Sequence, residues 1–210
     1  MATRRGREAE RLLLLEGTHL FQELLRHGDQ PREVIATEMW LQRHADLVDR
    51  CSADVSWRLV TEEVLAAALT TVTPDGVACL ASLDDLPSMP SRLDFLLVLD
   101  RLQDPGNLGT LLRTALAADV QGVWLGSGVD PLATKTLRSS AGALLQLPHR
   151  RYGPDEQTAI QQLEQALRQL SAQGLQVVAT LPPDDRSALP VAPYWQLDWT
   201  APTALLLGTE

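Results

Sequence analysis

The stretch DPGNLGTLLRTA, residues 104–115, decides how this chain is organised, because it joins a strand pattern to a helix pattern. The run before it, residues 95–99, is apolar throughout, as expected of a strand buried in a parallel sheet. Residues 104–107 have the composition of a turn, and apolar residues recur at helical spacing from Leu108 onward. Ligands of open α/β sheets bind where strands end in this way, so the stretch predicts a site that contains Arg113.

Strand and helix patterns alternate along most of the chain, which predicts an α/β protein. The expected strands lie at residues 33–37, 58–60, 76–82, 95–99, 122–125, 175–180 and 203–207. The expected helices lie at residues 7–27, 41–49, 62–69, 108–118, 131–139 and 155–173. Gly17 marks a point at which the first helix can break into a short strand or turn.

Composition changes once along the chain, and this predicts two domains. Residues 83–93 are rich in aspartate, proline and serine, as is typical of a linker. We therefore expect a small α/β domain at residues 1–82 and a second domain, built on a parallel sheet, at residues 94–210.

The distribution of charge argues for local contact with a polyanion. A net charge of −9 is not that of a general nucleic-acid binder. Residues 101–150 nevertheless carry five basic and three acidic side chains, and Arg4, Arg5 and Arg7 form a basic cluster near the start. Any contact with RNA is therefore expected to involve these two regions.

Several classes of protein are not supported by the sequence. No run of about 18 apolar residues predicts a membrane span, and the apolar run at residues 12–15 is too short for a signal-peptide core. Cys51 and Cys79 lack the spacing of a metal or redox site, which fits a reducing cytoplasm. We expect a cytoplasmic protein without a metal.

Three parts of the sequence match one family pattern. Seven residues fit the pattern D-P-x-N-x-G-x-x-x-R-T-A: Asp104, Pro105, Asn107, Gly109, Arg113, Thr114 and Ala115. Four more fit a second segment: Lys135, Arg138, Ser140 and Gly142. Residues 204–210 match a strand followed by G-x-E. The sequence thereby resembles the SpoU/TrmH family of RNA ribose 2′-O-methyltransferases, and residues 16–24 resemble the start of that family's N-terminal RNA-binding domain.

The resemblance implies methyl transfer from S-adenosylmethionine to a ribose 2′-hydroxyl of rRNA or tRNA. Arg113 and Asn107 are the implied catalytic residues. A guanidinium stays protonated in proteins, so we expect Arg113 to bind the adjacent phosphate and stabilise the developing alkoxide. The alternative for Arg113 is a plain ion pair with Asp119 or exposure to solvent; Asn107 caps the helix, holds the active loop, or does both.

The resemblance also implies two sets of binding residues. The expected cofactor-binding residues are Thr180, Leu181, Gly208 and Glu210. The expected RNA-binding residues are Lys135, Arg138 and Ser140 from the resemblance, together with Arg4, Arg5 and Arg7 from the basic cluster near the start of the chain. For Glu210 the alternative is a frayed terminus, and for Arg138 it is a solvated side chain after a tight turn.

The family fold is a parallel sheet of the SPOUT type whose C-terminal part forms a trefoil knot, and full-length members form homodimers. The strand followed by G-x-E at residues 204–210 resembles the opening of the family's motif 2, and the sequence given stops at Glu210. We therefore expect the knot-forming C-terminus to be missing from this chain. The alternative function is a catalytically inactive RNA-binding remnant of such an enzyme. A generic nucleotide-binding domain lacks support, because neither G-x-G-x-x-G nor G-x-x-x-x-G-K-[ST] occurs.

Overall fold

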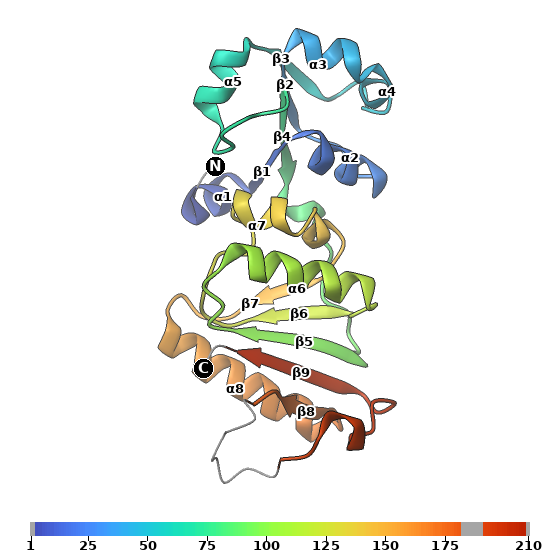
Figure 1. The fold of residues 1–210 in the computed structure, drawn as a ribbon, viewed down its shortest axis with the longest axis vertical. Helices are drawn as coiled ribbons and strands as arrows, with labels where there is room; N and C mark the ends of the chain where they lie inside the picture. Colours follow the sequence, from blue (N-terminus) through green and yellow to red (C-terminus); the bar gives the residue numbers. More distant parts are fainter. Residues whose placement is uncertain (1–2, 182–190, 209–210) are drawn as a thin grey trace. The chain divides into compact units, whose positions relative to one another are not determined.

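The computed structural model describes residues 3–181 and 191–208, which form two compact units (Figure 1). The first unit contains residues up to Pro87 together with residues 104–116 and 130–146. The second unit contains residues 88–103, 117–129 and the described residues from Leu147 onward. The chain passes repeatedly from one unit to the other. No helix in the described part of the chain is long and apolar enough to cross a membrane.

The first unit is built on a mixed four-stranded sheet of order β1-β4-β2-β3. Its strands are β1 (Leu12–Glu16), β2 (Glu33–Ala36), β3 (Ser56–Leu59) and β4 (Val77–Ser82). Its helices are α1 (Arg4–Glu10), α2 (Thr18–Arg26), α3 (Glu38–Arg43), α4 (Ala45–Val48), α5 (Glu62–Ala68), η1 (Leu83–Asp85), α6 (Pro105–Ala117), α7 (Thr134–Ser139) and η2 (Ala143–Leu145). Strand β4 pairs antiparallel with both β1 and β2, whereas β2 and β3 are parallel.

Aromatic packing and helix caps account for the amino-terminal part of this unit. The rings of Phe21 and Trp40 meet edge to face at 5.6 Å, and the indole N–H of Trp40 donates to Thr18 Oγ1 at 2.7 Å. The Thr37 and Thr61 hydroxyls accept from the backbone N–H groups that open α3 and α5.

The second unit is built on a five-stranded sheet of order β7-β6-β5-β9-β8, in which every pairing is parallel. Its strands are β5 (Phe95–Asp100), β6 (Gly122–Leu125), β7 (His149–Arg151), β8 (Gln176–Ala179) and β9 (Thr203–Gly208). Its helices are α8 (Glu156–Ala172) and η3 (Tyr194–Gln196). The parallel sheet expected from the apolar run at residues 95–99 is confirmed, and β5 lies at its centre.

Helix α8 packs on one face of this sheet. Its inner side chains Ala159 and Leu163 join Leu96, Val98 and other strand residues in one hydrophobic core. Asp155 caps the helix, since its Oδ1 accepts from the backbone N–H of Thr158 at 2.9 Å. At about 25 cal/mol per Å² of apolar area, such burial is the main source of stability for the sheet.

The structure corrects several expected elements. Residues 7–27 do not form one helix: α1 ends at Arg11, which has a φ of 56°, and β1 follows directly. A run of four leucines fits either period, and pairing with β4 buries Leu13 and Leu15 in the sheet. The helix expected at residues 41–49 is broken at His44 into α3 and α4. The helix expected at 131–139 begins only at Thr134.

Candidate functional site

The segment that matches the pattern D-P-x-N-x-G-x-x-x-R-T-A, residues 104–115, forms most of helix α6. Oδ1 of Asp104 accepts a hydrogen bond from the backbone N–H of Asn107 at 2.7 Å, so Asp104 caps the helix and Pro105 opens its first turn. The interpretation of Asn107 as the helix cap is therefore wrong. The Asn107 side chain is exposed on the first turn.

Arg113 lies on the outer side of the same helix. Helix α6 buries Leu108, Leu112 and Ala115, and Arg113 is exposed on the side away from them. Among the described residues no carboxylate forms an ion pair with Arg113, Asp119 included. The guanidinium is thus available to an anionic ligand.

Arg138 lies on α7, also in the first unit, and is anchored at one end of its guanidinium. Nη1 lies 2.7 Å from Oε2 of Glu16 and 2.6 Å from Oγ1 of Thr71. The Glu16 side chain is buried, and one third of the Arg138 side chain is exposed. The alternative of a wholly solvated Arg138 is therefore wrong.

The environment of Glu16 favours its charged form. Burial alone would raise the pKa of this carboxyl, but the hydrogen bonds from Thr71 and Thr70 and the charge of Arg138 together lower the pKa below its ordinary value. The backbone N–H groups of Thr70 and Thr71 each donate to the carboxylate at 3.0 Å. Glu16 is a candidate site residue that was not predicted from the sequence. The feature that could have indicated it is an acidic residue directly after the apolar run at residues 12–15.

Helix α7 packs tightly on the start of α6. The Ser139 hydroxyl donates to the backbone carbonyl oxygen of Pro105 at 2.8 Å. A Cβ atom on Gly109 would lie 2.6 Å from the carbonyl carbon of Ser139, a distance that real side chains do not adopt. The structure therefore brings the Arg138 segment and the amino end of the Arg113 helix together.

The two other residues predicted on this segment differ in exposure. Lys135 is exposed on α7, as a phosphate contact requires. Ser140 is buried, and its hydroxyl donates to the carbonyl oxygen of Leu137 at 3.0 Å. The buried Ser140 hydroxyl therefore presents no group to RNA, and a role for Ser140 in shaping the active site stays a prediction.

The three arginines near the start of the chain do not form one patch. Arg4 and Arg5 are exposed on α1, and Arg4 Nε lies 2.7 Å from Glu8 Oε1. Arg7 is only 4% exposed and forms an ion pair with Asp130. The expectation that Arg7 binds RNA is therefore wrong, because its charge is already paired inside the first unit.

The expected cofactor residues follow neighbouring strands of the second unit. Thr180 and Leu181 come after β8, and Gly208 ends β9. The backbone N–H of Thr180 donates to the carbonyl oxygen of Leu206 at 3.0 Å, which ties the two segments together. Glu210, predicted with them, lies outside the described residues.

Asp100, at the end of the central strand, belongs to the same edge and was missed. It pairs in register with Gly208, and its Oδ1 accepts from the backbone N–H of Ser127 at 3.2 Å. A side chain on Gly126 would meet the Asp100 carboxylate, so a larger residue there would displace that carboxylate. An acidic residue directly after a buried strand was the available signal.

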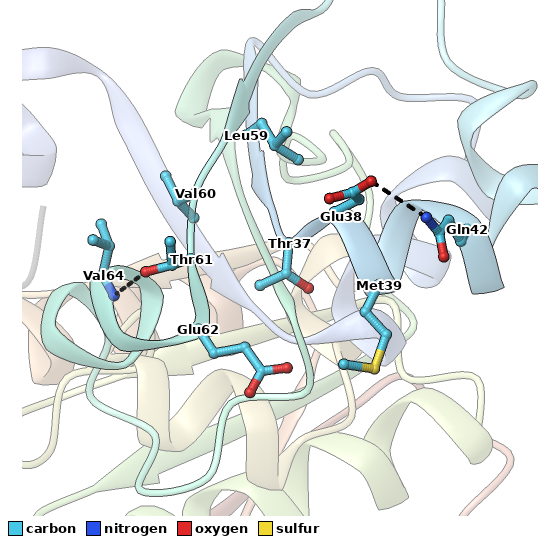
Figure 2. A pocket seen from close by; sticks show the side chains of 9 residues that line it. All are labelled: Thr37, Glu38, Met39, Gln42, Leu59, Val60, Thr61, Glu62 and Val64. Atoms are coloured by element: carbon cyan, nitrogen blue, oxygen red, sulfur yellow. Dashed lines mark hydrogen bonds between the residues drawn. The ribbon is translucent and has the colours of Figure 1, made fainter.

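Several hollows lie in the described part of the chain. A hollow of about 530 Å³ in the second unit is lined by Asp100, Leu206, Val177 and side chains of α8. A larger one, of about 880 Å³, lies between the starts of α3 and α5 in the first unit (Figure 2). Glu38 and Glu62 lie on the wall of this larger hollow, and their negative charge disfavours RNA. None of the predicted site residues lines it. In the described ranges no cluster of histidine, cysteine or acidic side chains could hold a metal ion.

Comparison with known proteins decides the family. The profile of the SpoU rRNA methylase family matches residues 94–210, and that of the MRM3-like substrate binding domain matches residues 1–79. The chain belongs to the SpoU rRNA methylase family. The first of these matches contains Arg113, Arg138 and the strands of the parallel sheet.

Relatives of this SpoU methylase are found among bacterial proteins. It is 42% identical over 209 residues to an uncharacterized tRNA/rRNA methyltransferase of Synechocystis. The alignment covers 98% of this chain and 71% of that protein. It is 28% identical to the 23S rRNA (guanosine(2553)-2′-O)-methyltransferase of Bacillus subtilis, covering 99% of this chain and 75% of the relative. The crystal structure of an AdoMet-bound rRNA methyltransferase from Sinorhizobium meliloti is similar with a TM-score of 0.71 and 26% identity, over 98% of this chain and 73% of that one.

Proposed function

We propose that this protein transfers a methyl group from S-adenosylmethionine to a ribose 2′-hydroxyl of rRNA. The observation that carries the proposal is Arg113 at its motif position on α6, exposed and without an ion pair to any described residue, in a chain of the SpoU family. Both the relative from Bacillus subtilis and the solved structure from Sinorhizobium meliloti are named as rRNA methyltransferases.

The carboxyl edge of the second unit fits S-adenosylmethionine. Asp100 offers a carboxylate for an amine or ribose hydroxyl, and Gly208 and Thr180 leave backbone within reach of a ligand. The Ser127 hydroxyl is buried and has no hydrogen-bond partner in the described part of the chain, as expected of a group that meets a ligand. We assign Thr180, Leu181, Gly208 and Glu210 to the cofactor, with Asp100 added.

When bound, the cofactor supplies an activated methyl group on a sulfonium that leaves as a neutral thioether. The protein's task is then to hold the ribose in line and to stabilise the oxygen as it loses its proton. Arg113 does this with N–H donors aimed at the neighbouring phosphate and at the developing alkoxide. Asn107 precedes Arg113 on α6 and is also exposed, and it orients the same part of the RNA.

RNA is bound in this proposal by Lys135, Arg138, Arg4 and Arg5. Arg4, Arg5 and Lys135 are exposed, and Arg138 is one-third exposed. Residues 1–82 serve as the substrate-binding domain, residues 94–210 as the methyltransferase domain and residues 83–93 as their connection. The family profiles at 1–79 and 94–210 support this division.

Three further properties are proposed from the family resemblance. A sheet of the SPOUT type is supported by the parallel pairing of β9 with the central strand β5. Homodimerisation is tested by light scattering of the purified protein. A cytoplasmic location is supported by the absence of a disulfide between Cys51 and Cys79 in the structure and is tested by fractionation.

The test is transfer of a tritiated methyl group from S-adenosylmethionine to purified rRNA and, separately, to tRNA. Methylation of the 2′-oxygen makes the neighbouring phosphodiester resistant to alkali, so a resistant labelled dinucleotide is the expected product. R113A is the negative control, and an exposed-site variant such as T110A is the positive one, since Thr110 has no assigned role.

Incorporation into rRNA with loss in R113A supports the proposal. Incorporation into tRNA alone changes the substrate class. Binding of RNA without any transfer, and without binding of S-adenosylmethionine by calorimetry, overturns the proposal in favour of an inactive RNA-binding remnant.

A further inference from the structure

Glu16 is a buried acidic residue that the proposed reaction does not use. It is the last residue of β1, and its side chain is 1% exposed. Its carboxylate accepts from the backbone N–H groups of Thr70 and Thr71 and from both of their hydroxyls. A buried carboxylate with this many donors has one orientation, so its remaining contact is directional.

That remaining contact is the guanidinium of Arg138. Nη1 of Arg138 donates three hydrogen bonds, to Glu16 at 2.7 Å, to Thr71 at 2.6 Å and to Thr70 at 3.4 Å. In the described part of the chain Nε and Nη2 of Arg138 take part in no recorded bond. Glu16 thus fixes one corner of a planar group and leaves the other donors for a ligand.

The same amino-terminal elements hold the rest of the Arg138 segment. The buried Arg7 of α1 pairs with Asp130, ahead of α7. A Cβ on Gly142 would lie 3.3 Å from Glu23 of α2, so the turn after α7 rests closely on that helix. Residues 130–146 are therefore in contact with the amino-terminal elements at three points: at Asp130 before α7, at Arg138 within it and at Gly142 after it.

Helix α7 in turn fixes the start of α6. Ser139, next to Arg138, donates to the Pro105 carbonyl, and its backbone fills the space beside Gly109. Any shift of Arg138 is thereby passed to the helix that carries Asn107 and Arg113. A displacement of about 1 Å at a positioning element can cost about a hundredfold in rate.

We propose that Glu16 is a positioning residue for methyl transfer: it orients Arg138 toward RNA and, through α7, sets the start of the Arg113 helix. The amino-terminal domain then completes the site in addition to binding substrate. The inference rests on the proposed function, because Arg138 and Arg113 are assigned to RNA there.

The test is a double-mutant cycle of E16Q, R138Q and E16Q/R138Q, read as kcat and KM for RNA with the affinity for S-adenosylmethionine measured separately. E16Q keeps the side-chain volume and removes the charge that holds Nη1. We expect E16Q to lower kcat/KM about 10- to 100-fold with unchanged cofactor affinity. In the R138Q background, E16Q should have less than about a twofold further effect, because its partner is already gone.

E33Q is the matched control. Glu33 lies in the same sheet, on β2, and its partly exposed carboxylate forms an ion pair with the exposed Arg58, which is on β3. It should change kcat/KM by less than about twofold. Effects of E16Q and R138Q that multiply independently, or a loss of thermal stability in E16Q with kcat/KM intact, overturn the proposal.

A second variant serves if E16Q does not fold. T71V removes one hydroxyl that bonds both Glu16 and Arg138 and keeps the volume, so it should lower kcat/KM in the same direction by a smaller factor. An unchanged T71V alongside an unfolded E16Q counts against the proposal. If the wild-type protein transfers no methyl group, the cycle is read on the dissociation constant for RNA, so failure of the proposed reaction and failure of the Glu16–Arg138 coupling are distinguished.

Discussion

Gly109 and Ser139 are in such close contact that no side chain fits between them: a Cβ atom on Gly109 would lie 2.6 Å from the Ser139 carbonyl carbon and 2.7 Å from its Cβ. The two residues belong to α6 and α7, which carry Arg113 and Arg138. The family pattern has a glycine at this position, and the contact gives the physical reason for it.

Replacement of Gly109 should therefore disrupt the packing of α6 against α7. G109A forces the backbones of α6 and α7 apart, and we expect it to lower the free energy of unfolding by about 1–3 kcal/mol, as overpacking does. Chemical denaturation monitored by circular dichroism measures this. T110A, one residue away on the exposed side of α6, should stay within about 0.5 kcal/mol of the wild type. Equal stability of G109A and T110A would contradict the packing argument.

Removal of the Arg113 guanidinium should abolish activity without harming the fold. Arg113 is exposed and forms no ion pair in the described residues, so R113A and R113K should unfold at the wild-type temperature. We expect kcat to fall about 10²- to 10³-fold in R113A, the usual cost of losing a donor that stabilises a developing oxyanion. R113K keeps the charge but not the planar donor pair, and it should recover only part of the loss. Full activity in R113A would remove Arg113 from the reaction.

Gly208 should be needed for the cofactor more than for the sheet. A Cβ on Gly208 meets its nearest neighbour, the Asp100 carbonyl oxygen, at 3.6 Å, which is ordinary contact. G208V should therefore fold but weaken S-adenosylmethionine binding about tenfold or more, because a branched side chain occupies the carboxyl edge of the sheet. Calorimetric titration measures the affinity, and the thermal midpoint of the same sample shows that the fold is intact. Unchanged affinity would place the cofactor elsewhere.

The sequence predicted the second unit well because its signals are local. The apolar run at residues 95–99 is bounded by Asp94 and Asp100 and followed by a turn, which favours a short buried strand, and the structure confirms a central parallel strand there. The run of leucines in β1 fits a helix and a strand equally, and pairing with β4, some 65 residues later, decides between them. Local patterns do not contain that information.

The candidate site shows the same limit. Arg113 and Arg138 were found because they match a pattern, but the partner of Arg138 came only from the structure. Glu16 reaches Arg138 across 122 positions of the chain, and Arg7 reaches Asp130 across 123. Such pairs change what a residue does: Arg7 becomes a buried structural residue, and Glu16 becomes a candidate for positioning. Spacing along a sequence predicts neither.

His149 should make the protein sensitive to mild acid. Burial lowers the pKa of this imidazole, and the hydrogen bond to the Leu147 carbonyl only partly offsets it. The folded state therefore binds the proton less readily than the unfolded state, whose histidine titrates at about 6.5. Stability should be complete above that value and should decline as the pH falls below it toward the lowered pKa of the folded state. H149Q should flatten this part of the profile of unfolding free energy against pH, whereas H19Q, at an exposed histidine, should leave it unchanged. A decline of the same size in H149Q and the wild type would assign the acid sensitivity to other groups.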